Sequence, residues 1–111
     1  MNKKATNQFD EEHLSVLRYV HNHNNEKFNQ REIADNLNIS LGKLNYLIKQ
    51  LVKKGFVKIK NFKKSKKKSS YLYVITPQGL SQKIEMTKSF MTRKMREYDE
   101  LKKEISDVDN S

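Results

Sequence analysis

The spacing of apolar residues over positions 40–53 predicts a helix, and the side chains on its outer face are of types that can contact DNA bases. Apolar residues recur at i, i+3, i+4, i+7 and i+8, which predicts one buried face formed by Leu44, Leu47, Ile48, Leu51 and Val52. The opposite face is small, polar, aromatic or cationic, and holds Ser40, Gly42, Lys43, Asn45, Tyr46, Lys49, Gln50 and Lys53. This face has no core to bury, and the major groove of DNA admits an α-helix that presents such side chains.

We assign the early residues of this face to base contacts, because recognition helices present their N-terminal residues to base edges. The base-reading candidates are Ser40, Lys43, Asn45 and Tyr46. An asparagine amide pairs with adenine and a lysine ammonium with guanine, while a tyrosine packs on a thymine methyl or bonds a phosphate. The alternative for Tyr46 is packing on its neighbour Gln50. Phosphate contacts are assigned to the following set: Lys49, Gln50, Lys53, Lys63, Lys64, Lys66, Lys67 and Lys68.

The positive charge of the chain is concentrated in its middle. The 111 residues carry a formal charge of +10. Between Asn36 and Ile84 there are twelve lysines and no acidic residue, and the remainder carries −2. A continuous basic segment predicts a polyanionic partner. The alternative, for a run such as residues 66–68 alone, is a solvated loop.

Several classes of chemistry are excluded by what the chain lacks. Without cysteine there is no disulfide framework, zinc finger or thiol nucleophile. His21 and His23 are two residues apart and point to different sides of a helix, so no metal site is expected. No phosphate loop, nucleophile elbow or catalytic carboxylate pair is visible, which predicts no enzyme and no cofactor. The longest apolar run, residues 71–75, is far short of the ~20 residues of a membrane span, and no export signal is seen. We therefore expect a cytoplasmic protein without membrane contact.

The elements around the helix at 40–53 follow from capping and periodicity. Helical spacing predicts a first helix over about residues 9–23, and Asn29 with Glu32 predicts the capped start of a short second helix. Gly55 is expected to end the third helix. Residues 56–62 and 71–76 alternate with period two, which predicts a two-stranded hairpin around the lysine-rich loop.

Thr76 and Pro77 are expected to open a last helix, over residues 77–108, as a unit separate from a domain at 9–76. A heptad pattern places apolar residues on one seam, and the expected dimerisation residues are Leu80, Ile84, Met91, Tyr98, Leu101 and Ile105. A helix of about 45 Å is longer than so small a domain can cover, so we expect it to pack on a second copy of the chain. The alternative is a helix that folds back along its own domain.

This order of elements, and the residues from Asn29 to Lys58, resemble the DNA-binding core of MarR-type winged helix-turn-helix regulators. Within them the chain is most similar to the short EPS-associated transcriptional regulators, on the motifs Ser40–Tyr46, Lys60–Phe62, Thr76–Gly79 and Arg93–Tyr98. The resemblance implies a mainly α winged helix with a long C-terminal dimerisation helix. It also implies a bacterial regulator encoded near exopolysaccharide biosynthesis genes. The chain is shorter than typical MarR proteins, which puts their ligand pocket in doubt.

The expected function is therefore that of a homodimeric regulator that binds double-stranded DNA sequence-specifically. The rival is a winged-helix module that binds another protein through its long helix and docks on nucleic acid without reading sequence, because fold alone does not decide function. The sequence does not identify an effector ligand or the DNA sequence of the operator.

Overall fold

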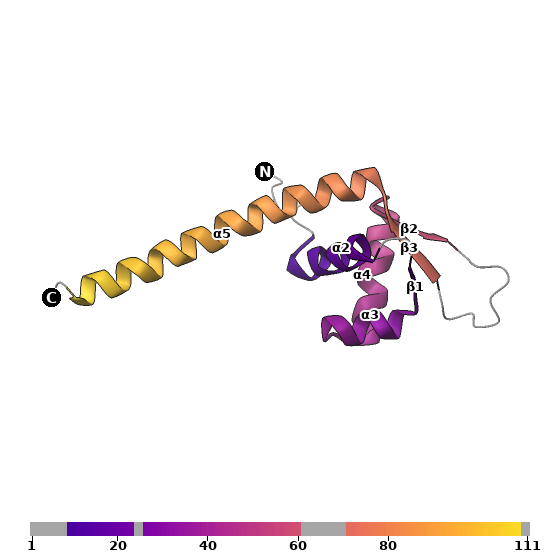
Figure 1. The fold of residues 1–111 in the computed structure, drawn as a ribbon, viewed down its shortest axis with the longest axis horizontal. Coiled ribbons are helices and arrows are strands. Elements are labelled where there is room, and N and C mark those ends of the chain that lie inside the picture. The colour runs from indigo at the N-terminus through magenta and orange to yellow at the C-terminus, as the bar shows by residue number, and fades with distance from the viewer. Residues whose placement is uncertain (1–8, 24–25, 61–70, 110–111) are drawn as a thin grey trace.

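The computed structural model describes residues 9–23, 26–60 and 71–109. Figure 1 shows the elements, which in chain order are α2 (Glu11–Asn22), β1 (Lys27–Phe28), α3 (Gln30–Leu37), α4 (Leu41–Lys53), β2 (Val57–Lys60), β3 (Tyr71–Ile75) and α5 (Pro77–Asp109). The predicted order of three helices, hairpin and long final helix is confirmed. The structure is that of a mainly α winged helix-turn-helix.

The helices begin where the sequence supplies caps. The Asn29 side chain accepts the backbone N–H of Glu32, whose carboxylate accepts the N–H of Asn29, as the capping box predicts. Ser40 caps α4 by accepting the backbone N–H of Lys43. Gly55 follows the end of α4 with a φ of 81°, a left-handed conformation that glycine adopts without strain. These local signals therefore fix the ends of the two helices that matter most for the site.

The sheet has one strand more than the sequence predicted. β2 and β3 pair antiparallel, with Val57 opposite Ile75, which confirms the hairpin. β1 pairs with the other edge of β3, so that the strand order is β1-β3-β2. A strand of two residues is too short for a period-two pattern, and its pairing with residues 71–72 is a contact between distant parts of the chain. The expected two-stranded sheet is thus corrected to three strands.

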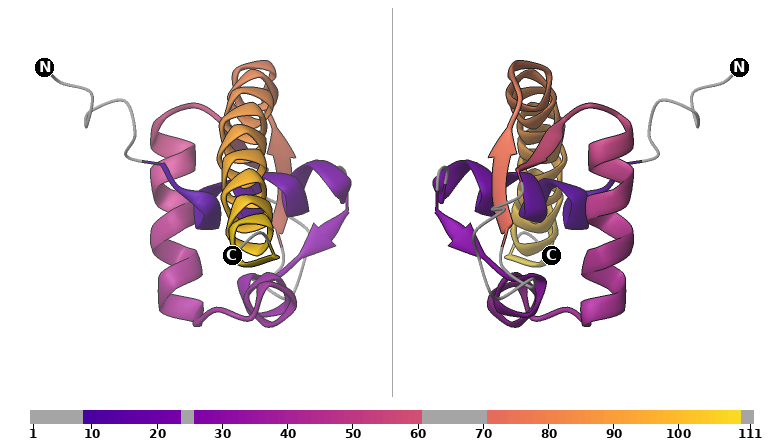
Figure 2. Two further views of the ribbon diagram at one scale, coloured as in Figure 1. Left: turned by 90° about the vertical axis from the view of Figure 1, so that its left-hand side faces the viewer. Right: turned by 90° about the vertical axis from the view of Figure 1, so that its right-hand side faces the viewer.

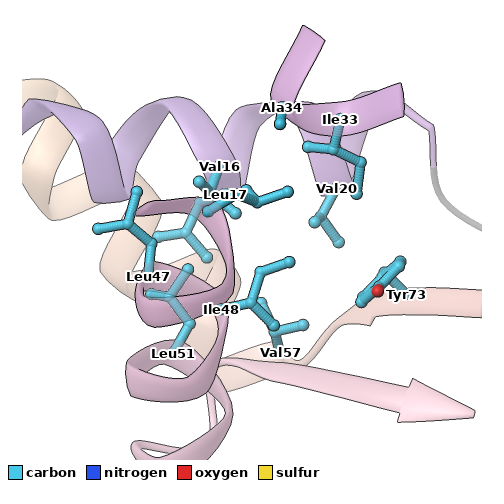
Figure 3. Packing of buried hydrophobic residues seen from close by; sticks show 11 residues of the cluster. Val16, Leu17, Val20, Ile33, Ala34, Leu47, Ile48, Leu51, Val57 and Tyr73 are labelled. Atoms are coloured by element: carbon cyan, nitrogen blue, oxygen red, sulfur yellow. The ribbon is translucent and has the colours of Figure 1, made fainter. Parts of the chain in front are cut away.

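The core lies where α2, α3 and α4 meet the sheet. Figure 3 shows the buried side chains of these elements pointing toward one another. The core residues share a relative exposure of 2% or less, and are Val16, Leu17, Val20, Ile33, Ala34, Leu44, Leu47, Ile48, Leu51, Val57 and Tyr73. The apolar face predicted for α4 is this buried face, apart from Val52, which is 38% exposed. The packing holds the opposite face of α4 outward.

Helix α5 starts on this core and then leaves it. Its first turns contact α2 and β3, with Gly79 buried and Met86 packed against the core. All residues from Met91 to Asp109 are exposed. Figures 1 and 2 show the helix extending past the other elements as a single straight rod. The alternative of a helix that folds back along its own domain is therefore wrong for residues 91–109.

Candidate nucleic-acid interface

The outward face of α4 combines the candidate residues on one surface. Tyr46 is 56% exposed, and Lys43, Lys49 and Lys53 are exposed with it. Exposed lysines 58 and 60 continue the positive charge along β2. The five loop lysines assigned to phosphates lie at residues 63–68, outside the described residues. The described part of the site is therefore a helix face with an exposed aromatic ring among cations.

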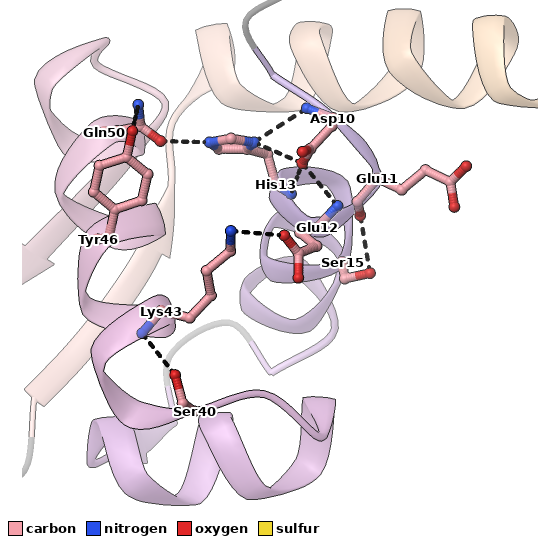
Figure 4. Close-up of polar contacts among 9 residues, drawn as sticks. All are labelled: Asp10, Glu11, Glu12, His13, Ser15, Ser40, Lys43, Tyr46 and Gln50. Carbon is pink, nitrogen blue, oxygen red and sulfur yellow. Dashed lines mark hydrogen bonds and ion pairs between the residues drawn. The ribbon is translucent and has the colours of Figure 1, made fainter.

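Lys43 is held by an ion pair with the first turn of α2. Its Nζ lies 3.1 Å from Glu12 Oε1, and both side chains are about half exposed (Figure 4). The hydrogen bond to this carboxylate, together with its charge, raises the pKa of Lys43 above the ordinary value. A guanine contact by Lys43 has to compete with Glu12, so the base-reading role assigned to Lys43 requires this ion pair to open or to be shared.

Asn45 and Ser40 also have partners inside the domain. The Asn45 Nδ2 donates to Gln30 Oε1 at 3.1 Å. This hydrogen bond joins α4 to the first turn of α3. The Ser40 hydroxyl accepts the Lys43 N–H as the cap of α4, and Ser40 remains exposed. Asn45 keeps its Oδ1 and one N–H for a base, because an amide offers two donors and an acceptor. The structure thus brings the four base-reading candidates to one end of α4, and each of them already has a partner inside the domain.

A chain of hydrogen bonds runs from α2 to Tyr46 through a buried histidine (Figure 4). The Nδ1 of His13 lies 3.1 Å from the Asp10 backbone nitrogen and 3.0 Å from the Asp10 carboxylate oxygen, and the Nε2 of the same ring hydrogen-bonds to Gln50 Oε1 at 2.7 Å. The Gln50 Nε2 then donates to the Tyr46 hydroxyl at 3.1 Å. Tyr46 is therefore an acceptor toward Gln50 and keeps its own proton for an outside acceptor, such as a phosphate oxygen. The alternative considered for Tyr46, contact with Gln50, is present, and it leaves the exposed tyrosine hydroxyl able to donate to DNA.

The sequence assigned Gln50 to a phosphate contact, but both ends of its side-chain amide have partners inside the domain. Its carbonyl oxygen is occupied by His13, whose ring is only 4% exposed. Sequence analysis missed three residues that position the site, Glu12, His13 and Gln30. The position of Gln30 could have been predicted from the sequence, because the Asn29 cap places the next residue in the first turn of α3. No local signal exists for the contact of His13 with Gln50, which are 37 positions apart.

The cap of α2 predicts an acid-linked loss of stability. Burial by itself raises the pKa of Asp10, but hydrogen bonds from the His13 side chain and backbone, its charge, and the Glu12 N–H outweigh burial, so the pKa is lowered. Because the pKa of Asp10 is lower in the folded than in the unfolded protein, its ionised carboxylate stabilises the fold at every pH above 3.8, the ordinary pKa. This stabilisation is lost as the pH falls through the lower pKa of the folded protein.

We therefore expect the wild type to unfold at a higher temperature than Asp10→Asn, which keeps a cap acceptor, at about pH 6. This difference between the two proteins should shrink as the pH falls below 3.8 and the wild-type carboxylate is protonated. The measurement is the thermal unfolding midpoint of both proteins across this range. A constant difference would show that the Asp10 charge contributes nothing. Asp35→Asn, at an exposed carboxylate of α3, is the matched control.

Other kinds of site are not seen in the part of the chain that the structure describes. No three His, Asp or Glu side chains come together there in a way that could hold a metal ion. None of the helices described there is long and apolar enough to cross a membrane.

Two comparisons with known proteins agree with this geometry. Residues 11–58, which run from α2 into β2, match a sequence family described as winged helix-turn-helix DNA-binding. The chain thus contains a winged helix-turn-helix domain, and no curated protein matches its sequence.

Solved structures that are similar to most of the chain include two MarR regulators and a competence repressor. MarR superimposes with a TM-score of 0.62 at 15% identity, over 81% of this chain and 60% of MarR. A MarR transcriptional regulator from Methanosarcina mazei Go1 gives 0.58 at 23% identity, over 73% and 55% of the two chains. The adhesin competence repressor AdcR from Streptococcus pyogenes gives 0.56 at 20% identity, over 88% and 69%. The chain therefore has the MarR fold and spans less than two thirds of the length of the first two structures.

Proposed function

We propose that this protein is a transcriptional regulator that binds double-stranded DNA sequence-specifically as a cytoplasmic homodimer. The observation that carries the proposal is the outward face of α4, where Tyr46 lies exposed among lysines on a helix held by a winged helix-turn-helix domain. The twelve lysines between Asn36 and Ile84 supply the attraction to phosphate, and the polar face supplies groups that distinguish base edges. Residues 9–76 would bind DNA and residues 77–108 would join the copies.

The proposal is tested by selecting bound duplexes from a random DNA pool with the purified protein at about 150 mM salt, which suppresses purely electrostatic binding. We expect an inverted repeat with half-sites about one helical turn apart. Recovery of no motif, with binding lost at this salt, would contradict sequence reading.

The second candidate is a winged-helix module that docks on nucleic acid without reading sequence and binds another protein through α5. It is favoured by the internal partners of Lys43 and Asn45, since a side chain that is already paired has less to offer a base. Equal affinity for all duplexes, with a steep salt dependence, would support this candidate.

Asn45→Ala separates the two candidates. If Asn45 reads a base, the substitution should cost about 1–3 kcal/mol on the selected site and little on random DNA. The measurement is the dissociation constant on both duplexes at one salt concentration. Gln30→Ala is the control, because it removes the internal partner of Asn45 and leaves the Asn45 amide in place. Equal losses on both duplexes would mean that Asn45 reads no base and only joins α3 to α4.

We further propose that the regulated genes belong to exopolysaccharide biosynthesis, on the resemblance of the motifs at residues 40–46 and 76–79 to the EPS-associated branch. The selected motif tests this directly, because it can be searched for upstream of such genes in the source genome. A motif found only upstream of unrelated genes would overturn the assignment.

A further inference from the structure

The exposed part of α5 has an unusual distribution of charge. Residues 88–96 hold four cations and no acidic residue, a charge of +4. Residues 97–109 hold six carboxylates and two lysines, a charge of −4. The sign changes between Arg96 and Glu97, near the middle of the exposed stretch. The helix is therefore an electrostatic dipole along its own length, in addition to its apolar seam.

The apolar seam crosses this change of sign. Met91, Tyr98 and Ile105 follow one another at seven-residue spacing and are 57%, 63% and 65% exposed. Leu101 continues the seam at 60% exposure. A row of large apolar side chains on a helix without its own core is the pattern of a helix that packs on another helix.

We infer that two copies of α5 pair antiparallel, centred near Tyr98, so that the basic segment of each copy lies against the acidic segment of the other. This inference rests on the homodimer in the proposed function and specifies how its copies are arranged. The charged side chains within about 90° of the seam carry +2 in the basic segment, from Lys88 and Lys94, and −2 in the acidic segment, from Glu97, Lys102, Glu104 and Asp109. A parallel pair in register would place like charges beside each other, whereas the antiparallel pair places +2 beside −2 twice. The arrangement is two-fold symmetric, as most homodimers are.

The position of the seam around the helix agrees with joint DNA binding. Gly79, Met86 and Phe90 face the domain: Gly79 is buried, Met86 packs on the core, and the Arg18 guanidinium lies 5.8 Å from the centre of the Phe90 ring. At about 100° per residue, the seam residues Met91 and Tyr98 lie roughly 100–120° around the helix from Gly79. The face of α5 that meets the partner helix is therefore roughly perpendicular to the face that carries the domain. A two-fold axis through such a pair places both domains on the same side of the two helices.

The spacing of the two domains also fits. The domain sits over the first half of α5, around residue 85, about 13 residues from the centre of the pair. At 1.5 Å per residue, the two domains are about 40 Å apart along the helix pair. Half-sites one turn apart on DNA are separated by about 34–36 Å. An antiparallel pair centred near Tyr98 therefore brings two α4 helices to successive turns of one face of the duplex.

The first test is reversal of charge on one segment. Lys88→Glu with Lys94→Glu should weaken dimerisation at least about tenfold, because both positions lie beside the seam and like charges then face each other across the antiparallel pair. Adding Glu104→Lys and Asp109→Lys in the same chain should restore the dimer, because these positions oppose residues 94 and 88 of the partner helix. In a parallel pair the basic segments of the two copies already face each other, so the first variant replaces a contact between cations by one between carboxylates. Dimerisation should then change little, and the second pair of substitutions should restore nothing. Lys54→Glu with Lys58→Glu makes the same change of net charge off α5, and should leave the mass in solution unchanged.

The second test measures the geometry directly. The chain has no cysteine, so Ser106→Cys carries a single spin label on an exposed position of α5. In the antiparallel pair the two labelled backbones are roughly 25 Å apart, and in a parallel pair about 10 Å. Circular dichroism of each variant confirms that the helix is retained.

The outcomes distinguish this inference from the proposed function. A mass of one chain, 13.2 kDa, for the wild type at micromolar concentration would overturn both the pairing and the homodimer. Selection of a DNA motif would still test sequence reading in that case. A dimer with a label distance near 10 Å, or one whose dissociation constant is unchanged by Lys88→Glu with Lys94→Glu, would overturn the antiparallel arrangement and leave the homodimer standing.

Discussion

Gly79→Ala should lower the free energy of unfolding by about 3 kcal/mol, the upper end of the usual cost of overpacking. A Cβ on this residue would lie 2.0 Å from the backbone oxygen of Phe56 and 2.9 Å from a side-chain carbon of Ile75. The start of α5 has no freedom to move away. The Gly79 N–H donates to the Thr76 hydroxyl at 2.9 Å, and this hydroxyl donates to the Gly55 oxygen at 2.6 Å.

The measurement is urea unfolding of the variant beside wild type. Gly42→Ala is the matched control, because a Cβ there meets nothing within 4 Å and the residue is exposed on α4. This control should gain up to about 1 kcal/mol from helix propensity. An unchanged midpoint for Gly79→Ala would show that the start of α5 can separate from β2 and β3 without cost.

Replacing the five lysines at positions 63–68, in the loop between β2 and β3 that we call the wing, with glutamine should weaken binding to every DNA sequence alike. For two copies with about three to five phosphate contacts each, log K of the wild type should fall with log salt at a slope of about −5 to −9. Each wing lysine that contacts a phosphate contributes about 0.9 to this slope, so the variant, with Lys63, Lys64, Lys66, Lys67 and Lys68 changed, should show a shallower one. The affinity should fall further than for any single substitution on α4.

The measurement is a titration of one duplex at four or more salt concentrations. A matched pair of variants, Lys66→Gln with Lys67→Gln and Lys102→Gln with Lys103→Gln, removes the same charge from the wing and from the far end of α5. Only the first pair should flatten the slope. An unchanged slope for the five-lysine variant would remove the wing from the interface.

Much of the fold could be predicted because its signals are local. The caps at Asn29 and Ser40 and the left-handed Gly55 are signals within one helical turn, and the structure has all three. The seven-residue spacing on α5 predicted a helix whose seam its own domain does not cover, and residues 91–109 are indeed exposed. Strand β1 was not predictable in this way, because two residues become a strand only when β3 lies beside them.

The sequence by itself determined the charge, the order of the elements and which face of α4 is polar, since composition and periodicity depend only on residues close together in the chain. The tertiary structure alone decided which of those polar groups are already engaged. Glu12 approaches Lys43, and Gln30 approaches Asn45, because the packing of the core brings α2 and α3 against α4. The same packing places His13 against Gln50. Contacts between elements depend on how their buried faces fit, and no spacing within the sequence records that fit.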